Sequence, residues 1–154
     1  QRDMVRRGTA LYGTGVKALD GAVHPAQTLR THPLRVCEIE KGETVGYSRA
    51  FRAARRTRVM TIPCGYGDGY PRILSGRADV LVNGRRAPVI GNICMDMMMA
   101  DVTDAGEITP ESEVVLLGAQ GGERITPDEL AQLAETIPYE IMLGFSQRVA
   151  RRFA

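Results

Sequence analysis

Short β-rich segments separated by turn residues fill the chain from about residue 30 to residue 120. Asn83-Gly84, which lies between VLV and RRAPVI, gives the strongest hairpin signal, because both residues accept the positive φ of a type I′ turn. The predicted strands lie within residues 34–40, 44–51, 58–64, 78–82, 87–93, 97–102 and 113–118. They place Tyr47 on a strand.

One helix is predicted near the end of the chain. Thr126 is suited to cap it, Pro127 to its first position, and Glu129 to the capping box. Pro138 is expected to end it, because a residue before proline disfavours the helical conformation. Together with the short strands, and without internal repeats, this predicts a mainly β fold: an antiparallel β-barrel or compact sandwich with one late α-helix.

Composition indicates a water-soluble protein with one principal domain. The chain has 154 residues, of which 44% are hydrophobic and 25% charged. Residues 14–27 mix glycine, proline and small residues as a linker does, so we place a boundary near residue 30 and the main domain over residues 31–154. No stretch approaches the roughly 20 apolar residues of a membrane span, and no signal-peptide pattern follows the N-terminal charges. We therefore expect a cytoplasmic protein without a membrane partner.

Cysteines and histidines give no metal or disulfide pattern. The chain has three cysteines and no CxxC pair. Cys94 stands near Asp96, but no histidine is close in the sequence to activate it, so a structural cysteine is favoured. His24 and His32 lack metal-ligand spacing, and we assign no metal.

Two segments contain tyrosines in settings that suit a ligand site. Residues 65–72, GYGDGYPR, follow a probable strand, and their glycines would let the backbone turn sharply and approach a ligand. From spacing alone, a turn with surface tyrosines is the simpler interpretation. Tyr47 is equally ambiguous, since a tyrosine on a strand is more often a packed aromatic than a base.

Arginine clusters at residues 52–58 and 148–152 allow an alternative function. They could contact nucleic-acid phosphates, which would make the chain a non-catalytic β-barrel binding module. Against this stand a net charge of only +2, an aromatic content of 5% and the lack of a recognisable nucleic-acid module. A solvated strand face is favoured, and no nucleic-acid partner is expected.

An ordered set of motifs adds a family resemblance. MVRRGTALYG, VGYSRAF, IPCGYGDGYPR, APVIGNICMDM, TIPYEI and RVARRF resemble, in order and approximate spacing, the C-terminal third of alanine racemases. The resemblance covers essentially the whole chain. It implies a pyridoxal 5′-phosphate (PLP) enzyme that interconverts L-alanine and D-alanine, of which D-alanine is a peptidoglycan precursor. It implies that this enzyme is a head-to-tail homodimer. It also implies that residues 1–30 are the remnant and linker of a (β/α)8 barrel and that a C-terminal β-domain follows.

The resemblance assigns Tyr47 as a catalytic residue. Racemisation removes the α-proton from one face of the cofactor-bound amino acid and returns a proton to the other, so two acid/base groups must flank the cofactor. In the family a barrel lysine, which also holds PLP, serves one face, and a tyrosine from the partner's β-domain serves the other. Tyr47 matches that tyrosine and would need cations from the barrel to act as a base.

Other site residues are implied in the same way. Arg6 matches the arginine that faces the pyridine nitrogen of PLP, while Gly8 and Thr9 match the backbone amides that hold its phosphate. Tyr66 matches a substrate-binding tyrosine at the entrance, and Met95 matches the residue whose backbone amide meets the substrate carboxylate.

Arg72 and Asp96 match polar residues of the entrance corridor. Asn92 and Gln147 depart from the family, because some members have an arginine and a tyrosine there.

The lysine that holds PLP has no counterpart here. Lys17 and Lys41 are the only lysines, and neither lies in a matching motif. We therefore expect a fragment that is inactive alone. Alanine is the default substrate, although related racemases that act on serine or on a broader range share the architecture.

Overall fold

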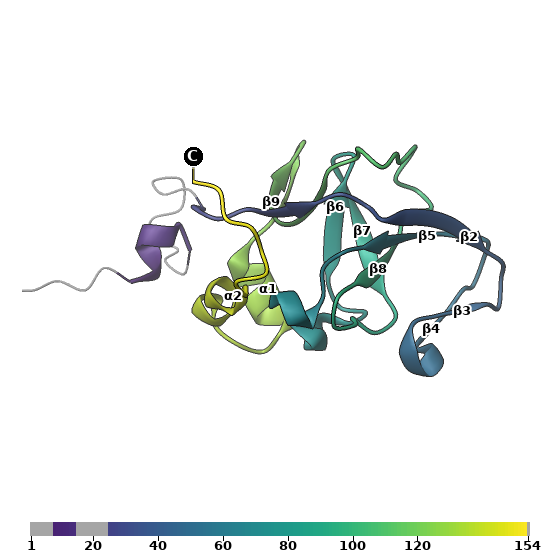
Figure 1. The fold of residues 1–154 in the computed structure, drawn as a ribbon, viewed down its shortest axis with the longest axis horizontal. Coiled ribbons are helices and arrows are strands. Elements are labelled where there is room, and N and C mark those ends of the chain that lie inside the picture. Colours follow the sequence, from purple (N-terminus) through teal and green to yellow (C-terminus); the bar gives the residue numbers. More distant parts are fainter. Residues whose placement is uncertain (1–7, 15–24, 154) are drawn as a thin grey trace, which may run out of the picture.

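The computed structural model describes residues 8–14 and 25–153. Its main feature is an eight-stranded antiparallel sheet, in which the strands follow the order β1-β9-β6-β7-β8-β5-β2 and β10 pairs with β9 (Figure 1). The strands are β1 (Leu29–Thr31), β2 (Arg35–Ile39), β5 (Thr57–Ile62), β6 (Asp79–Val82), β7 (Arg85–Ile90), β8 (Met98–Asp101), β9 (Val114–Gln120) and β10 (Glu123–Ile125). A separate hairpin contains β3 (Thr44–Val45) and β4 (Phe51–Arg52).

The two ends of the sheet are close neighbours in the sequence. Only residues 32–34 separate β1 from β2, although these strands lie at opposite ends of the strand order. The predicted mainly β, antiparallel fold is confirmed. Within residues 8–14 and 25–153, however, no strand pairing closes the sheet into a barrel.

Two late helices replace the single one predicted. α1 (Pro127–Leu133) begins as expected, because Thr126 Oγ1 accepts a hydrogen bond from the Glu129 N–H at 3.1 Å. α2 (Pro138–Gly144) starts at the proline that was expected to end the helical region. Proline suits the first turn, where its missing N–H has no partner in the helix. None of the helices in the described ranges is long and apolar enough to cross a membrane.

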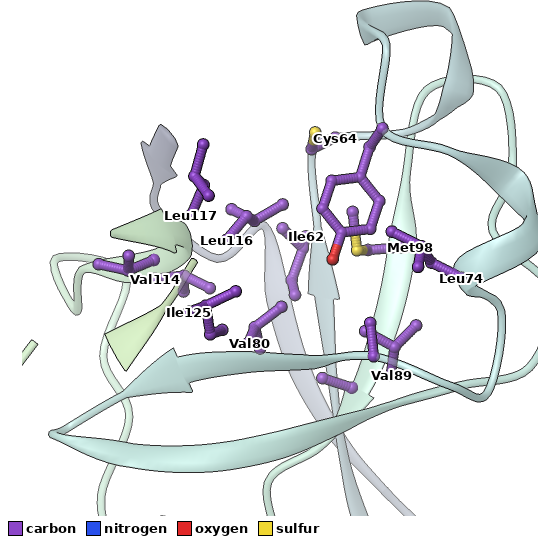
Figure 2. Close-up of a cluster of buried hydrophobic side chains, with 14 of the residues drawn as sticks. Ile62, Cys64, Leu74, Val80, Val89, Met98, Val114, Leu116, Leu117 and Ile125 are labelled. Atoms are coloured by element: carbon purple, nitrogen blue, oxygen red, sulfur yellow. The ribbon is translucent and has the colours of Figure 1, made fainter. Parts of the chain in front are cut away.

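The core lies between the curved sheet and these helices. Ile62 on β5, Val80 on β6 and Leu116 on β9 have no exposed surface and converge on one cluster (Figure 2). Leu130 of α1 and Ile141 of α2 are each 1% exposed and belong to the same cluster. Burial of these apolar side chains fixes the helices against the sheet.

The predicted Asn83-Gly84 turn is confirmed as the tip of the β6–β7 hairpin. Both residues have positive φ, 53° and 70°, and Val82 pairs with Arg85 across the turn. The Asn83 amide also donates hydrogen bonds to the carbonyls of Ala105 and Glu107, at 3.0 and 2.6 Å. The hairpin is therefore tied to the loop after β8.

Replacing Thr126 by alanine is expected to lower the free energy of unfolding by about 1 kcal/mol, because it removes the oxygen that caps α1. Thr126→Ser keeps a capping oxygen and serves as the matched control, and urea denaturation of both variants measures the difference. Equal stability of the alanine and serine variants would contradict the assigned cap.

Candidate active site

Tyr47 lies on an exposed turn and not on a strand. The 3₁₀ turn η3 (Tyr47–Arg49) joins β3 to β4, and 72% of the Tyr47 surface is exposed. Gly46, Ser48 and Arg49 all have positive φ, which is incompatible with a continuous strand. The predicted strand over residues 44–51 is therefore wrong at its centre. The break presents the tyrosine to solvent.

The loop of residues 91–97, between β7 and β8, contacts this turn. Asn92 Nδ2 donates a hydrogen bond to the carbonyl oxygen of Tyr47 at 2.9 Å. The loop is closed by a hydrogen bond from the Cys94 N–H to the Met97 carbonyl and is held by one from the Ile93 N–H to Ser75 Oγ, both at 2.9 Å. Tyr47 is thus anchored to an ordered loop.

Backbone hydrogen bonds hold the Tyr66 segment against the loop of residues 91–97, which carries Met95. The N–H of Tyr66 donates to the Cys94 carbonyl at 3.0 Å, and that of Gly67 donates to the Met95 carbonyl at 2.8 Å. Tyr66, on the 3₁₀ turn η4 (Tyr66–Asp68), is 47% exposed, and Met95 is 52% exposed. Among the described residues, the Met95 N–H donates no hydrogen bond to protein.

Arg148 joins the two segments by ion pairs that the sequence analysis missed. Its guanidinium lies 3.3 Å from Asp68 and 2.6 Å from Asp96, and the hydrogen bond to Asp96 raises the pKa of Arg148. The predicted corridor residue Asp96 is therefore already paired within the chain. Arg72, an exposed residue of the 3₁₀ turn η5 (Arg72–Leu74), has no ion pair within the described ranges.

The predicted phosphate-binding residues lie elsewhere. Gly8 is exposed and Thr9 begins the 3₁₀ turn η1 (Thr9–Tyr12), whereas Arg6 lies outside the described residues. A Cβ placed on Gly8 would lie 2.8 Å from the hydroxyl of Tyr139 on α2, a tyrosine that sequence analysis did not assign. Its TIPYEI motif was the available signal.

Tyr47 and the Gly8 region lie at opposite ends of one chain. In Figure 1 the turn η1, in purple, and the β3–β4 hairpin are at the two ends of the longest axis. One chain therefore cannot bring its own Tyr47 to a cofactor whose phosphate its own Gly8 holds without a large rearrangement. Tyr47, Tyr66, Met95 and Asp96 form one group, while Gly8 and Thr9 belong to another.

Arginines of the 52–58 cluster are largely paired. Arg55 forms an ion pair with Asp104, Arg56 forms one with Glu38, and Arg58 donates a hydrogen bond to the Gly106 carbonyl at 2.7 Å. Arginines that are paired within the chain in this way are more typical of a solvated strand face than of a phosphate-binding surface. The described residues also contain no group of three or more histidine, cysteine or acidic side chains that could hold a metal ion.

Cys64 is expected to resist alkylation at about pH 8.5, since burial, helped by the charge of Asp68, raises the pKa of its thiol to about 12. Cys37 and Cys94 are only partly buried, and mass spectrometry after brief iodoacetamide treatment should find label on these two alone. Urea should expose Cys64 to the reagent. Labelling of Cys64 in the folded chain at the rate of Cys94 would contradict its burial.

The same thiol makes the fold sensitive to alkali. The unfolded cysteine loses its proton near the ordinary pKa of 9.0, whereas the folded one keeps it to about 12. The unfolded chain therefore binds fewer protons across this window, and the contribution of Cys64 to the free energy of unfolding falls as the pH rises from about 9 towards 12.

Comparison with known proteins identifies relatives over nearly the whole chain. The family model "Alanine racemase, C-terminal domain" matches residues 26–153. The alanine racemase of Symbiobacterium thermophilum is 48% identical over 97% of this chain and 40% of its own length. That of Clostridium kluyveri is 41% identical over 98% of this chain and 40% of its own length. The chain thus spans about two fifths of the curated relatives it matches.

Solved structures agree with the sequence relatives. The alanine racemase of Streptomyces coelicolor superposes with a TM-score of 0.88 at 33% identity, covering 96% of this chain and 39% of that one. The enzyme of Bartonella henselae, solved with covalently bound pyridoxal phosphate, gives a TM-score of 0.76 at 31% identity, covering 82% and 34%. On these grounds the chain belongs to the alanine racemase family, of which it contains the C-terminal domain.

Proposed function

We propose that this chain is the C-terminal part of a PLP-dependent alanine racemase and that Tyr47 transfers the α-proton on one face of the amino acid. The observation that carries the proposal is the position of Tyr47. It is exposed at a hairpin tip, anchored to the loop that carries Met95, and remote from Gly8 in its own chain. This arrangement suits a tyrosine that completes the active site of a partner subunit in a homodimer.

The residues near Gly8 fit a phosphate group. Gly8 has no side chain to block the approach of an anion, and the hydroxyl of Tyr139, which can donate a hydrogen bond, faces the same position. The backbone amides of Gly8 and Thr9 would hold the phosphate, and Arg6 would face the pyridine nitrogen. When bound, PLP supplies the electron sink that stabilises negative charge at the substrate α-carbon.

The group around Met95 fits the other end of the substrate. The Met95 N–H would donate to the alanine carboxylate, and Tyr66 beside it would narrow the space around the amino acid. The Met95 amide would hold the carboxylate of alanine in place. Tyr47 would then hold or release the proton at its phenol oxygen. Arg72 and the Asp96–Arg148 pair would line the approach to the site.

This chain supplies only part of such a site. Lys41 is exposed just before β3, and Lys17 lies outside the described residues. The structure therefore gives no reason to assign either one as the lysine that holds the cofactor. We propose that the lysine belongs to the barrel part of the enzyme. The chain alone is then expected to show no racemisation.

Mixed dimers test the supply of Tyr47 across the subunit interface. One subunit carries Tyr47→Phe, and the other has its barrel lysine replaced by alanine. If Tyr47 acts on the partner's cofactor, one of the two sites in the mixed dimer contains both defects and the other contains none, so mixing two inactive proteins restores alanine racemisation. Mixed dimers that stay inactive would show that each site draws both residues from one subunit. Native mass spectrometry of the mixture, which separates the mixed dimers from the two parental ones by mass, controls for subunit exchange.

A further inference from the structure

We infer that Asn92 is a positioning residue for Tyr47: its side-chain amide holds the backbone of the Tyr47 turn at a fixed place relative to Met95. The inference rests on the proposed function, since it concerns the geometry of the same reaction. It starts from the hydrogen bond of 2.9 Å between Asn92 Nδ2 and the Tyr47 carbonyl oxygen. Asn92 itself is only partly buried and points to the backbone, so it acts on the tyrosine through the chain.

The turn needs such a support because its backbone is strained. Ser48 and Arg49 adopt φ values of 61° and 51°, which are costly for residues with side chains. The hairpin beneath them has only two residue pairs, and a hairpin of this size is not stable by itself. Its remaining hydrogen bonds, between residues 42–43 and 52–53, lie at the end away from Tyr47. Within the turn, only the Arg49 N–H to Gly46 carbonyl bond, at 3.3 Å, closes the backbone.

The backbone of the Asn92 loop lies close to the backbone of the hairpin at two glycines. A Cβ on Gly91 would lie 2.9 Å from the Val45 carbonyl oxygen, and a Cβ on Gly46 would lie 3.2 Å from the Asn92 nitrogen. The two backbones are therefore in close contact, and the Asn92 amide adds the polar link that reaches the Tyr47 carbonyl. A shift of this loop would move the turn with it.

The same loop determines where the substrate carboxylate would bind. Met95 follows Asn92 by three residues, and the Ile93 N–H is fixed by Ser75 Oγ on the far side of the loop. Asn92 thus connects the proposed proton-transfer group to the proposed carboxylate donor through a short, ordered segment. The distance between these two groups governs whether the α-carbon is presented to Tyr47, and displacements near 1 Å are enough to slow catalysis.

The test is Asn92→Asp in the complete enzyme that carries this chain. Aspartate keeps the shape of asparagine but replaces the amide donor by a carboxylate oxygen that repels the Tyr47 carbonyl. The readout is exchange of the α-proton with solvent deuterium, measured separately for L- and D-alanine. We expect exchange from the enantiomer that Tyr47 serves to fall about 10- to 100-fold and exchange from the other to fall less, with kcat reduced more than KM. Asn92→Gln retains a donor on a longer arm and is expected to restore part of the rate.

Asn83→Asp is the matched control. It removes an amide that also donates to loop carbonyls, but at the tip of the β6–β7 hairpin, where both bonds go to the loop after β8 and neither goes to the Tyr47 turn. We expect its exchange rates for both enantiomers to stay within about twofold of the parent, as for a surface change away from the site.

The outcomes separate this inference from the proposed function. An Asn92→Asp enzyme that matches the parent, or that loses exchange equally for both enantiomers, would overturn the positioning role while leaving racemisation and the role of Tyr47 intact. A parent enzyme that does not racemise alanine would instead overturn the proposed function, and the positioning role with it.

Discussion

Replacement of Tyr47 by phenylalanine is expected to lower alanine racemisation on the order of 10³-fold, which is within the usual range for loss of a general acid/base group. The variant removes one hydroxyl from a side chain that is 72% exposed, so folding should not change. Because the change removes one hydroxyl and leaves the proposed cofactor-binding residues Arg6, Gly8 and Thr9 as they are, PLP absorbance should remain. Proton exchange should be lost chiefly on one face, which deuterium incorporation into each enantiomer measures.

Tyr70→Phe provides the matched control for this change. Tyr70 has no exposed surface, and its hydroxyl has no hydrogen-bond partner among the described residues. Removing it takes away a buried polar atom without breaking a contact, so activity should be unchanged and stability equal or slightly higher. A Tyr47→Phe enzyme as active as the Tyr70→Phe enzyme would show that Tyr47 is not the proton-transfer group.

The sequence predicted those parts of the fold that depend on local chemistry. The Asn83-Gly84 turn and the Thr126 cap are both specified by neighbouring residues, and both are confirmed. VGYSRAF was predicted to be a strand because its composition is typical of one. The turn that it forms instead has a hydrogen bond from Asn92 to the Tyr47 carbonyl, and Asn92 lies 45 positions away from Tyr47. Local propensity contains no information about such a contact.

Long-range ion pairs limited the prediction of the site in the same way. The arginine cluster at the C-terminus suggested a solvated face or phosphate contacts, whereas Arg148 joins Asp68 and Asp96. No spacing rule connects residues that the fold brings together from separate loops. Tyr66 and Met95 were predicted as site residues because their motifs resemble the family, but the backbone hydrogen bonds that join their two segments emerged only from the structure.

Replacing Gly69 by alanine is expected to cost about 3 kcal/mol or more of stability, which corresponds to a fall in Tm of about 6–12 °C for a chain of this size. Gly69 has φ +100°, and a Cβ there would overlap the carbonyl oxygen of Gly144 and lie 2.6 Å from its carbonyl carbon. These are backbone atoms at the end of α2, so they cannot move aside as a flexible side chain would. Relief requires separating α2 from the loop that carries Tyr66.

Gly42→Ala separates the strain from the clash. Gly42 has a similar φ of +93°, but nothing lies within 4 Å of the position where its Cβ would stand. This variant therefore reports the conformational cost alone, about 1–2 kcal/mol. Thermal denaturation should show a larger loss for Gly69→Ala, and the difference measures how tightly the end of α2 is fitted against the Tyr66 loop. Equal losses of stability in the two variants would mean that α2 can move away from the Tyr66 loop at little cost. Tyr66 and Met95 would then be held in place by loop 91–97 and Arg148 alone.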